Sequence, residues 1–247
     1  MINIRSESEI NKMKEAAKVV RDLLFDIESM VSPGITTLEL DKYAESYIID
    51  KGAIPGFKGL YGFPGTICVS INDEVVHGVP SNRKLNEGDI VGIDVGSIFE
   101  GYYGDHAKTF PVGTINEDIK KLLHVTKECL MKGINQAVPG NRIGDIGYAI
   151  QKHAESNSYS VVKELVGHGI GQKLHEEPQI PNYGLKNSGP IIQEGMCFAI
   201  EPMINFGEES IYTKSDSWTV CTKDGQPSAH FEHTITITKD GPEVLTK

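Results

Sequence analysis

Two aspartates stand out in the sequence because their spacing could place two carboxylates side by side. Asp94 and Asp105 lie in the two β-rich arms of segment 88–110, whose break at Phe99-Glu100-Gly101 is typical of a β-hairpin. A two-residue loop at Phe99-Glu100 would set the two carboxylates directly opposite each other, with Cβ atoms roughly 5 Å apart. A loop at Glu100-Gly101 would make them diagonal neighbours on one face, because side chains alternate along a strand.

Two carboxylates held this close repel each other by about 3 kcal/mol at an effective dielectric constant of about 20. The repulsion is relieved if one group is protonated, if both are exposed to water, or if a cation binds between them. From the hairpin alone, an exposed acidic pair on a solvated face explains the sequence as well as a metal site does. Features elsewhere in the chain have to distinguish the two.

The size and charge of the chain exclude several classes of protein. Its 247 residues, with an ordinary apolar content, suffice for one large core or two small ones. The formal net charge of −10 argues against direct nucleic-acid binding, which needs a basic surface. No apolar run reaches the length of a membrane span, and the N-terminus lacks the apolar core of a signal peptide. The four cysteines have no paired spacing, so we expect a cytoplasmic protein without membrane binding.

Helix-start signals and apolar periodicity predict four helices and several strands. Capping-box sequences at Ser6-Glu9 and Thr36-Glu39 begin helices that run to about residues 30 and 52. Two more helices are predicted at about 116–136 and 144–156. Besides the hairpin, strands are predicted at 66–72, 161–166, 196–200, 211–221 and 231–238.

The sequence contains signs of an internal duplication. The segments Glu87 to Asp94 and Glu194 to Glu201 each run from a Glu-Gly turn through an apolar strand to a carboxylate. They begin 107 residues apart (87 and 194), and two Pro-Gly turns lie 106 residues apart (33 and 139). Asp105-His106 has a counterpart in Glu232-His233. Chance produces such short matches, but the nearly equal offsets favour two similar halves, about 1–120 and 121–247, packed around a pseudo-two-fold axis.

This packing would bring four carboxylates together, which a protein interior tolerates only with cations. Two divalent ions would neutralise Asp94, Asp105, Glu201 and Glu232. His168, bracketed by glycines, is the best candidate for an imidazole ligand, although taken alone it is more simply a turn residue. Such an oxygen-rich set suits Mn, Fe(II) or Co, with Zn as a further candidate. Zincin, nucleophile-elbow and P-loop motifs are absent from the sequence, which leaves two-metal hydrolysis.

Considered together, these residues show that the chain closely resembles the type I methionine aminopeptidases, whose pita-bread fold is shared with prolidases and creatinase. The matching motifs cover nearly the whole chain: 69–80, 88–94, 101–105, 167–178, 200–203, 218–220 and 231–234. The resemblance implies an α+β pita-bread fold in one catalytic domain, 1–247, with a curved, mostly antiparallel sheet covered by helices. It also implies that no N-terminal extension is present.

The resemblance implies a role for each candidate residue. Asp94 would chelate one ion, Asp105 and Glu232 would bridge two ions, and His168 with Glu201 would complete the second. A metal-bridging hydroxide would attack the first peptide carbonyl, with Glu201 handling the proton. His175 would stabilise the oxyanion and His77 would contact the substrate backbone or the leaving amine. Without the resemblance, His77 and His175 would be ordinary loop histidines.

The resemblance also implies which substrate binds and which residues line its pocket. Phe63, Cys68 and Trp218 match places that line the methionine pocket, although core packing explains each of them as well. The substrates would be nascent polypeptide N-termini with a small second residue, met during transient association with the ribosome, and the enzyme would be a monomer. Gly96, His106 and His230 depart from the family pattern, and none of them is an expected ligand.

Two alternatives remain open. One is an Xaa-Pro aminopeptidase or prolidase, which shares the metal ligands but usually carries a separate N-terminal domain. The other is a catalytically inactive pita-bread module that binds peptides or partner proteins. Such modules typically lose ligands, whereas this sequence has all five.

Overall fold

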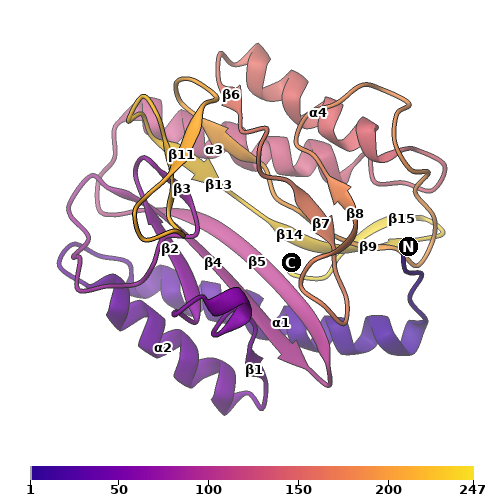
Figure 1. Cartoon of the computed structure of the whole chain (residues 1–247), viewed down its shortest axis with the longest axis horizontal. Helices are drawn as coiled ribbons and strands as arrows, with labels where there is room; N and C mark the ends of the chain where they lie inside the picture. The colour runs from indigo at the N-terminus through magenta and orange to yellow at the C-terminus, as the bar shows by residue number, and fades with distance from the viewer. Residues whose placement is uncertain (1) are drawn as a thin grey trace.

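The computed structural model describes residues 2–247 and contains four long helices. These are α1 (Glu7–Met30), α2 (Thr37–Asp50), α3 (Glu117–Ile134) and α4 (Ile143–Ser156). Both predicted capping boxes are confirmed. Ser6 and Thr36 each accept a hydrogen bond from the backbone N–H three residues later, and that residue's carboxylate accepts one from the backbone N–H of Ser6 or Thr36. Figure 1 shows α1 and α2 along one side of the molecule and α3 and α4 along the other.

The first half of the chain builds a sheet around one long hairpin. This sheet contains β1 (Ile54–Pro55), β2 (Ile67–Ile71), β4 (Ile90–Phe99) and β5 (Tyr102–Pro111), and β4 pairs with all three of the others. In Figure 1 the β4–β5 hairpin crosses the middle of the molecule above α1. All of these pairs are antiparallel.

The second half builds a similar sheet of five strands, in the order β15-β14-β9-β7-β8. These are β7 (Gly167–Gly169), β8 (Glu176–Ile180), β9 (Cys197–Ile200), β14 (His233–Thr238) and β15 (Gly241–Val244). Two small sheets complete the fold, β13-β10-β6 and β11-β12-β3. Their strands are β3 (Glu74–Val76), β6 (Ser160–Val161), β10 (Met203–Asn205), β11 (Ile211–Thr213), β12 (Val220–Thr222) and β13 (Ser228–His230).

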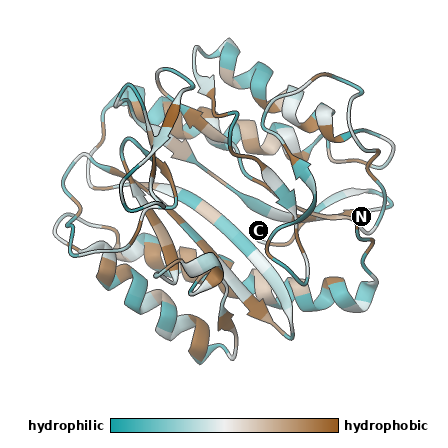
Figure 2. Ribbon diagram, viewed as in Figure 1, coloured by the Kyte–Doolittle hydropathy of each residue, from teal (hydrophilic) through white to brown (hydrophobic). Residues whose placement is uncertain are grey.

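Each half has an apolar core between its own helices and its own sheet. One core joins α1 and α2 to β2, β4 and β5, and the other joins α3 and α4 to β9 and β14. In Figure 2 the helices carry hydrophobic and hydrophilic residues side by side, as expected of helices that cover a sheet with one face. The predicted α+β class, with mostly antiparallel sheets covered by helices, is confirmed. No helix within residues 2–247 has the length and apolarity to cross a membrane.

The structure corrects three local predictions. The strand predicted at 161–166 is confined to Ser160–Val161, because the polar pair Lys163-Glu164 interrupts the apolar run and the chain bends there. The segment predicted as one strand at 211–221 is two strands, β11 and β12, joined by a loop in which Asp216 accepts hydrogen bonds from the backbone of Trp218 and Thr219. The strand predicted from residue 231 begins at His233.

Candidate metal centre

The hairpin places Asp94 and Asp105 on one face, as the second of the two predicted loops requires. Asp94 pairs with Ala107 and Asp105 pairs with Gly96, so the two aspartates are diagonal neighbours. The sequence left two loops open, and the one at Phe99-Glu100 is not formed. The loop is Glu100-Gly101, with φ of 46° and 81°, because two successive left-handed residues match the twist of a two-residue hairpin.

Hydrogen bonds between the two halves bring Glu232 to the hairpin. The backbone N–H of Glu232 donates to the carbonyl of Ala107 over 2.9 Å. The hydroxyl of Thr234 accepts from the backbone N–H of Asp105 and donates to its carbonyl, over 3.0 and 2.7 Å. The N-terminal part of β14 is therefore attached to β5, and the carboxylates of Asp105 and Glu232 face a common space.

The glycines beside His168 allow its strand to lie between two others. A Cβ at position 167 would be 2.4 Å from the carbonyl oxygen of Ala199, and one at 169 would be 2.2 Å from that of Glu177. No side chain fits at such distances, so the Gly-His-Gly sequence lets β7 pack closely against β8 and β9. His168 is thereby held beside Glu201, which directly follows β9.

The five predicted ligands converge. His168 Nε2 lies 3.8 Å from Asp105 Oδ2 and 3.6 Å from Glu201 Oε1. One ligand atom each from Asp105, His168 and Glu232 lies within 4.8 Å of the others. Asp94 and Glu201 line the same cavity as these three residues. Buried oxygens of Asp94 (Oδ1), Asp105 (Oδ1) and Glu232 (Oε1) have no hydrogen-bond partner among the described residues.

The pKa values of three of the four carboxylates show that ionising this cluster without a cation is unfavourable. Burial raises the pKa of Asp94 to about 7, and burial together with the charge of Asp94 raises the pKa of Asp105 well above its usual range. The pKa of Glu232 is raised in the same way, by burial and by the charge of Asp105. Burial also acts to raise the pKa of Glu201, but the imidazoles of His230 and His168 outweigh it and lower that pKa.

Divalent cations fit this site. The unpartnered buried oxygens would gain partners, and the positive charge would replace the protons that the raised pKa values favour. The donor set of four carboxylates and one imidazole is of the oxygen-rich kind that suits Mn, Fe(II), Co or Zn. The chemistry of the residues therefore supports a metal centre at the interface of the two halves.

A cavity of about 130 Å³ opens onto the five residues, and the other predicted site residues line it as well. Phe63 and Trp218 form an apolar wall, with ring centroids 5.1 Å apart in an edge-to-face arrangement. Cys68 pairs with Asp94 across β2 and β4 and lines the same cavity. The wall also includes Phe57, Leu60, Tyr61 and Leu174, none of which the sequence assigned to the pocket.

His77 and His175 lie at the cavity as uncharged imidazoles. Burial lowers the pKa of His77, which has a left-handed backbone with φ of 60°. Burial, followed by the neighbouring His168, lowers the pKa of His175 to about 4. The rings of His168 and His175 meet edge to face at 4.5 Å. Each neutral ring can donate one N–H to a group in the cavity.

His230 contacts the carboxylate of the proposed ligand Glu201. From the sequence it was noted only as a departure from the family pattern. Its Nε2 atom lies 3.4 Å from Glu201 Oε2, whereas His168 Nε2 lies 3.6 Å from the other oxygen, Oε1. Its backbone is fixed to β5, because Thr109 Oγ1 accepts from its N–H and donates to its carbonyl. Only the pairing of distant segments reveals this contact, so no local pattern in the sequence could have shown it.

Comparison with known proteins defines the class. Residues 11–239 match the model of metallopeptidase family M24, and the chain belongs to this family. The predicted metallopeptidase class is thereby confirmed, and with it hydrolase chemistry that depends on metal ions.

Individual relatives within this family narrow the comparison to particular enzymes. The chain is 51% identical to methionine aminopeptidase 1 of Bacillus subtilis, over all of both chains. It is 49% identical to a methionine aminopeptidase of Clostridium acetobutylicum, over 100% of this chain and 99% of that one. The crystal structure of methionine aminopeptidase from Rickettsia prowazekii matches with a TM-score of 0.99, at 45% identity and full coverage of both chains. Prolidase from Pyrococcus furiosus matches with a TM-score of 0.81 at 23% identity, and the chain covers 65% of it. The predicted pita-bread fold is confirmed.

Proposed function

We propose that this chain is a methionine aminopeptidase, which removes the first methionine from polypeptides whose second residue is small. The observation that carries the proposal is one cavity in which five ligand-type side chains lie beside an apolar wall. Relatives named methionine aminopeptidase, about half identical over the full length, support the same reaction.

The proposed metal ligands are Asp94, Asp105, His168, Glu201 and Glu232. Divalent ions bound there would polarise the substrate carbonyl and lower the pKa of a water molecule to make it nucleophilic. Since no ligand distinguishes them, Co, Mn, Fe(II) and Zn all remain candidates.

The chain's own residues have separate tasks around the reacting bond. Glu201 is ionised at neutral pH because its pKa is lowered, so it can accept the proton of the attacking water. His175 is neutral and can donate its ring N–H to the oxyanion that develops on the carbonyl. His77 would contact the substrate backbone or the leaving amine. Phe63, Cys68 and Trp218 would surround the methionine side chain, which matches their apolar and sulfur-bearing character.

The proposed substrates are nascent polypeptide N-termini, reached during transient association with the ribosome. The proposed enzyme acts as a monomer. Direct binding to nucleic acid or to a membrane is not part of the proposal, since the net charge is −10.

The test is cleavage of short peptides by protein loaded anaerobically with each metal in turn. We expect free methionine from Met-Ala-Ser, much less from Met-Leu-Ser, and none after treatment with a chelator. Faster cleavage of Ala-Pro-Ser than of Met-Ala-Ser would instead indicate an Xaa-Pro peptidase. Cleavage of neither peptide with any metal would indicate a binding module and would refute the proposed reaction.

A further inference from the structure

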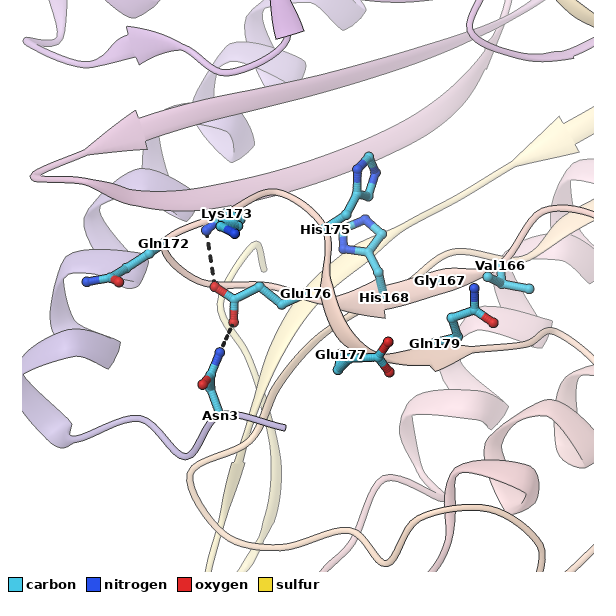
Figure 3. Close-up of a pocket in the computed structure, with 10 residues that line it drawn as sticks. All are labelled: Asn3, Val166, Gly167, His168, Gln172, Lys173, His175, Glu176, Glu177 and Gln179. Carbon is cyan, nitrogen blue, oxygen red and sulfur yellow. Dashed lines mark hydrogen bonds between the residues drawn. The ribbon is translucent and has the colours of Figure 1, made fainter. Parts of the chain in front are cut away.

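A larger groove lies beside the catalytic cavity, and the functions described so far do not use it. It encloses about 560 Å³ and shares the side chains of His168 and His175 with the catalytic cavity. Figure 3 shows the two imidazoles next to each other, with Gln179 to their right, Glu177 below them and Lys173 to their left. The catalytic cavity and the groove therefore adjoin at these two histidines.

One wall of the groove is β8, the outermost strand of its sheet. Gln179 lies directly opposite His168 in the pairing of β7 with β8, so both side chains project from the same face. Along β8 burial alternates, with Glu177 and Gln179 exposed and Pro178 and Ile180 buried. The exposed face of β8 thus continues from the proposed metal centre into the groove.

Two polar side chains on this face are free to bind a ligand. Within residues 2–247, the carboxylate of Glu177 and the amide of Gln179 make no hydrogen bond or ion pair. Glu176, by contrast, is neutralised by Arg5 and also accepts a hydrogen bond from Asn3. Glu177 therefore gives this end of the groove an uncompensated negative charge.

We propose that the groove binds the third and following residues of the polypeptide substrate in an extended conformation, and that Glu177 favours a basic side chain there. This rests on the proposed function, which puts the first residue in the catalytic cavity and the scissile bond beside His168 and His175. An extended chain leaving that point rises about 3.3 Å per residue and turns alternate side chains toward β8. The amide of Gln179 can bond to the peptide backbone, while the carboxylate of Glu177 attracts lysine or arginine.

The experiment compares kcat/KM for Met-Ala-Ser-Gly peptides that carry Lys, Gln or Glu at the third or the fourth position. At low ionic strength we expect the order Lys, Gln, Glu at one of these positions, with steps of about two- to fivefold, the size typical of one exposed charge pair. The differences should lie in KM and should shrink in high salt. Glu177→Gln should remove the order and Glu177→Lys should reverse it.

The matched control is Glu15→Lys on α1, which makes the same charge change at an exposed residue outside both cavities and should preserve the order. Equal rates for all peptides, or an order that survives Glu177→Lys, would overturn the inference. A preference for Glu that disappears in Lys173→Gln would place the substrate at the other end of the groove and overturn it too. If the wild-type protein fails to cleave Met-Ala-Ser, the proposed function fails first and this inference falls with it.

Discussion

The two halves of the molecule deliver their carboxylates to the same site in different ways. Asp94 and Asp105 lie within β4 and β5, ten-residue strands joined by a two-residue turn. Glu201 and Glu232 lie just outside β9 and β14, which have only four and six residues. The chain between them forms four more strands, β10 to β13. A local hairpin fixes the positions of the first two carboxylates, whereas the positions of the second two depend on contacts between distant segments.

This difference assigns different physical roles to the halves. The hairpin fixes the spacing of its aspartates through backbone pairing alone, so it can act as a rigid frame. The second half reaches that frame through Thr234, which hydrogen-bonds to both backbone groups of Asp105. We therefore expect changes in the backbone of the hairpin turn to alter stability and metal affinity together. Changes around Glu201 and Glu232 should alter the site more than the fold.

The largest expected effect comes from removing one buried carboxylate from either half. Asp105→Ala and Glu232→Ala should each lower kcat/KM at least about a thousandfold, because each loses several kcal/mol of metal-dependent stabilisation of the transition state. Bound metal, measured by mass spectrometry, should fall in both. The metal-free variants should melt no lower than metal-free wild type, because each change removes a buried acid whose ionisation burial and the neighbouring carboxylates disfavour. Wild-type turnover with full metal content in either variant would remove that residue from the site.

The same contrast explains what the sequence could predict. Asp94 and Asp105 could be placed on one face because hairpin pairing is local, although the choice between the two turns depended on the backbone conformation of Glu100. Glu201 and Glu232 were found through the duplication, which gave their identity but not their position beyond the strand ends. The contact between His230 and Glu201 depends on the pairing of β13 with β10, two segments far apart in the sequence, and left no signal in local residue patterns. The strand predicted at 161–166 failed because apolar content alone cannot show where a chain bends.

A smaller effect should follow from removing the support of Glu201. His230→Ala should lower kcat about 10- to 100-fold, the usual cost of losing a residue that orients a metal ligand, with KM little changed. His230→Gln should retain most of the activity, because an amide can donate to the same Glu201 oxygen. His124→Ala, at an exposed histidine on α3, is the control. Equal activity in the Ala and Gln variants would show that the imidazole only fills space.

The stability of the metal-free protein should fall as pH rises, and the gain in stability on adding metal should grow. Asp94, Asp105 and Glu232 have raised pKa values when folded, about 7 for Asp94. Between the unfolded value of about 4 and these folded values, the folded metal-free protein binds more protons than the unfolded chain, so its stability falls as pH rises. Manganese displaces those protons, so the rise in Tm on adding it should grow from pH 5 to pH 8. A metal-induced shift that is independent of pH would contradict the buried acid cluster.

The smallest expected effect concerns the hairpin turn itself. Gly101→Val places a branched side chain at φ of 81° and should cost about 1–2 kcal/mol, or about 2–8 °C in Tm. Gly225→Val, at φ of 70° in the second half, is a matched control, since neither position has an atom within 4 Å of the added Cβ. Calorimetry should show weaker metal binding only in Gly101→Val. Weaker binding in Gly225→Val alone would reverse the assigned roles of the halves.

The central claim is that both halves hold one shared pair of ions. Anomalous scattering from crystals grown anaerobically with manganese tests it most directly. We predict two peaks in the cavity, both within coordinating distance of Asp105 and Glu232, one also near Asp94 and the other near His168 and Glu201. Peaks bound by residues of one half only, or no peak in this cavity, would contradict the account.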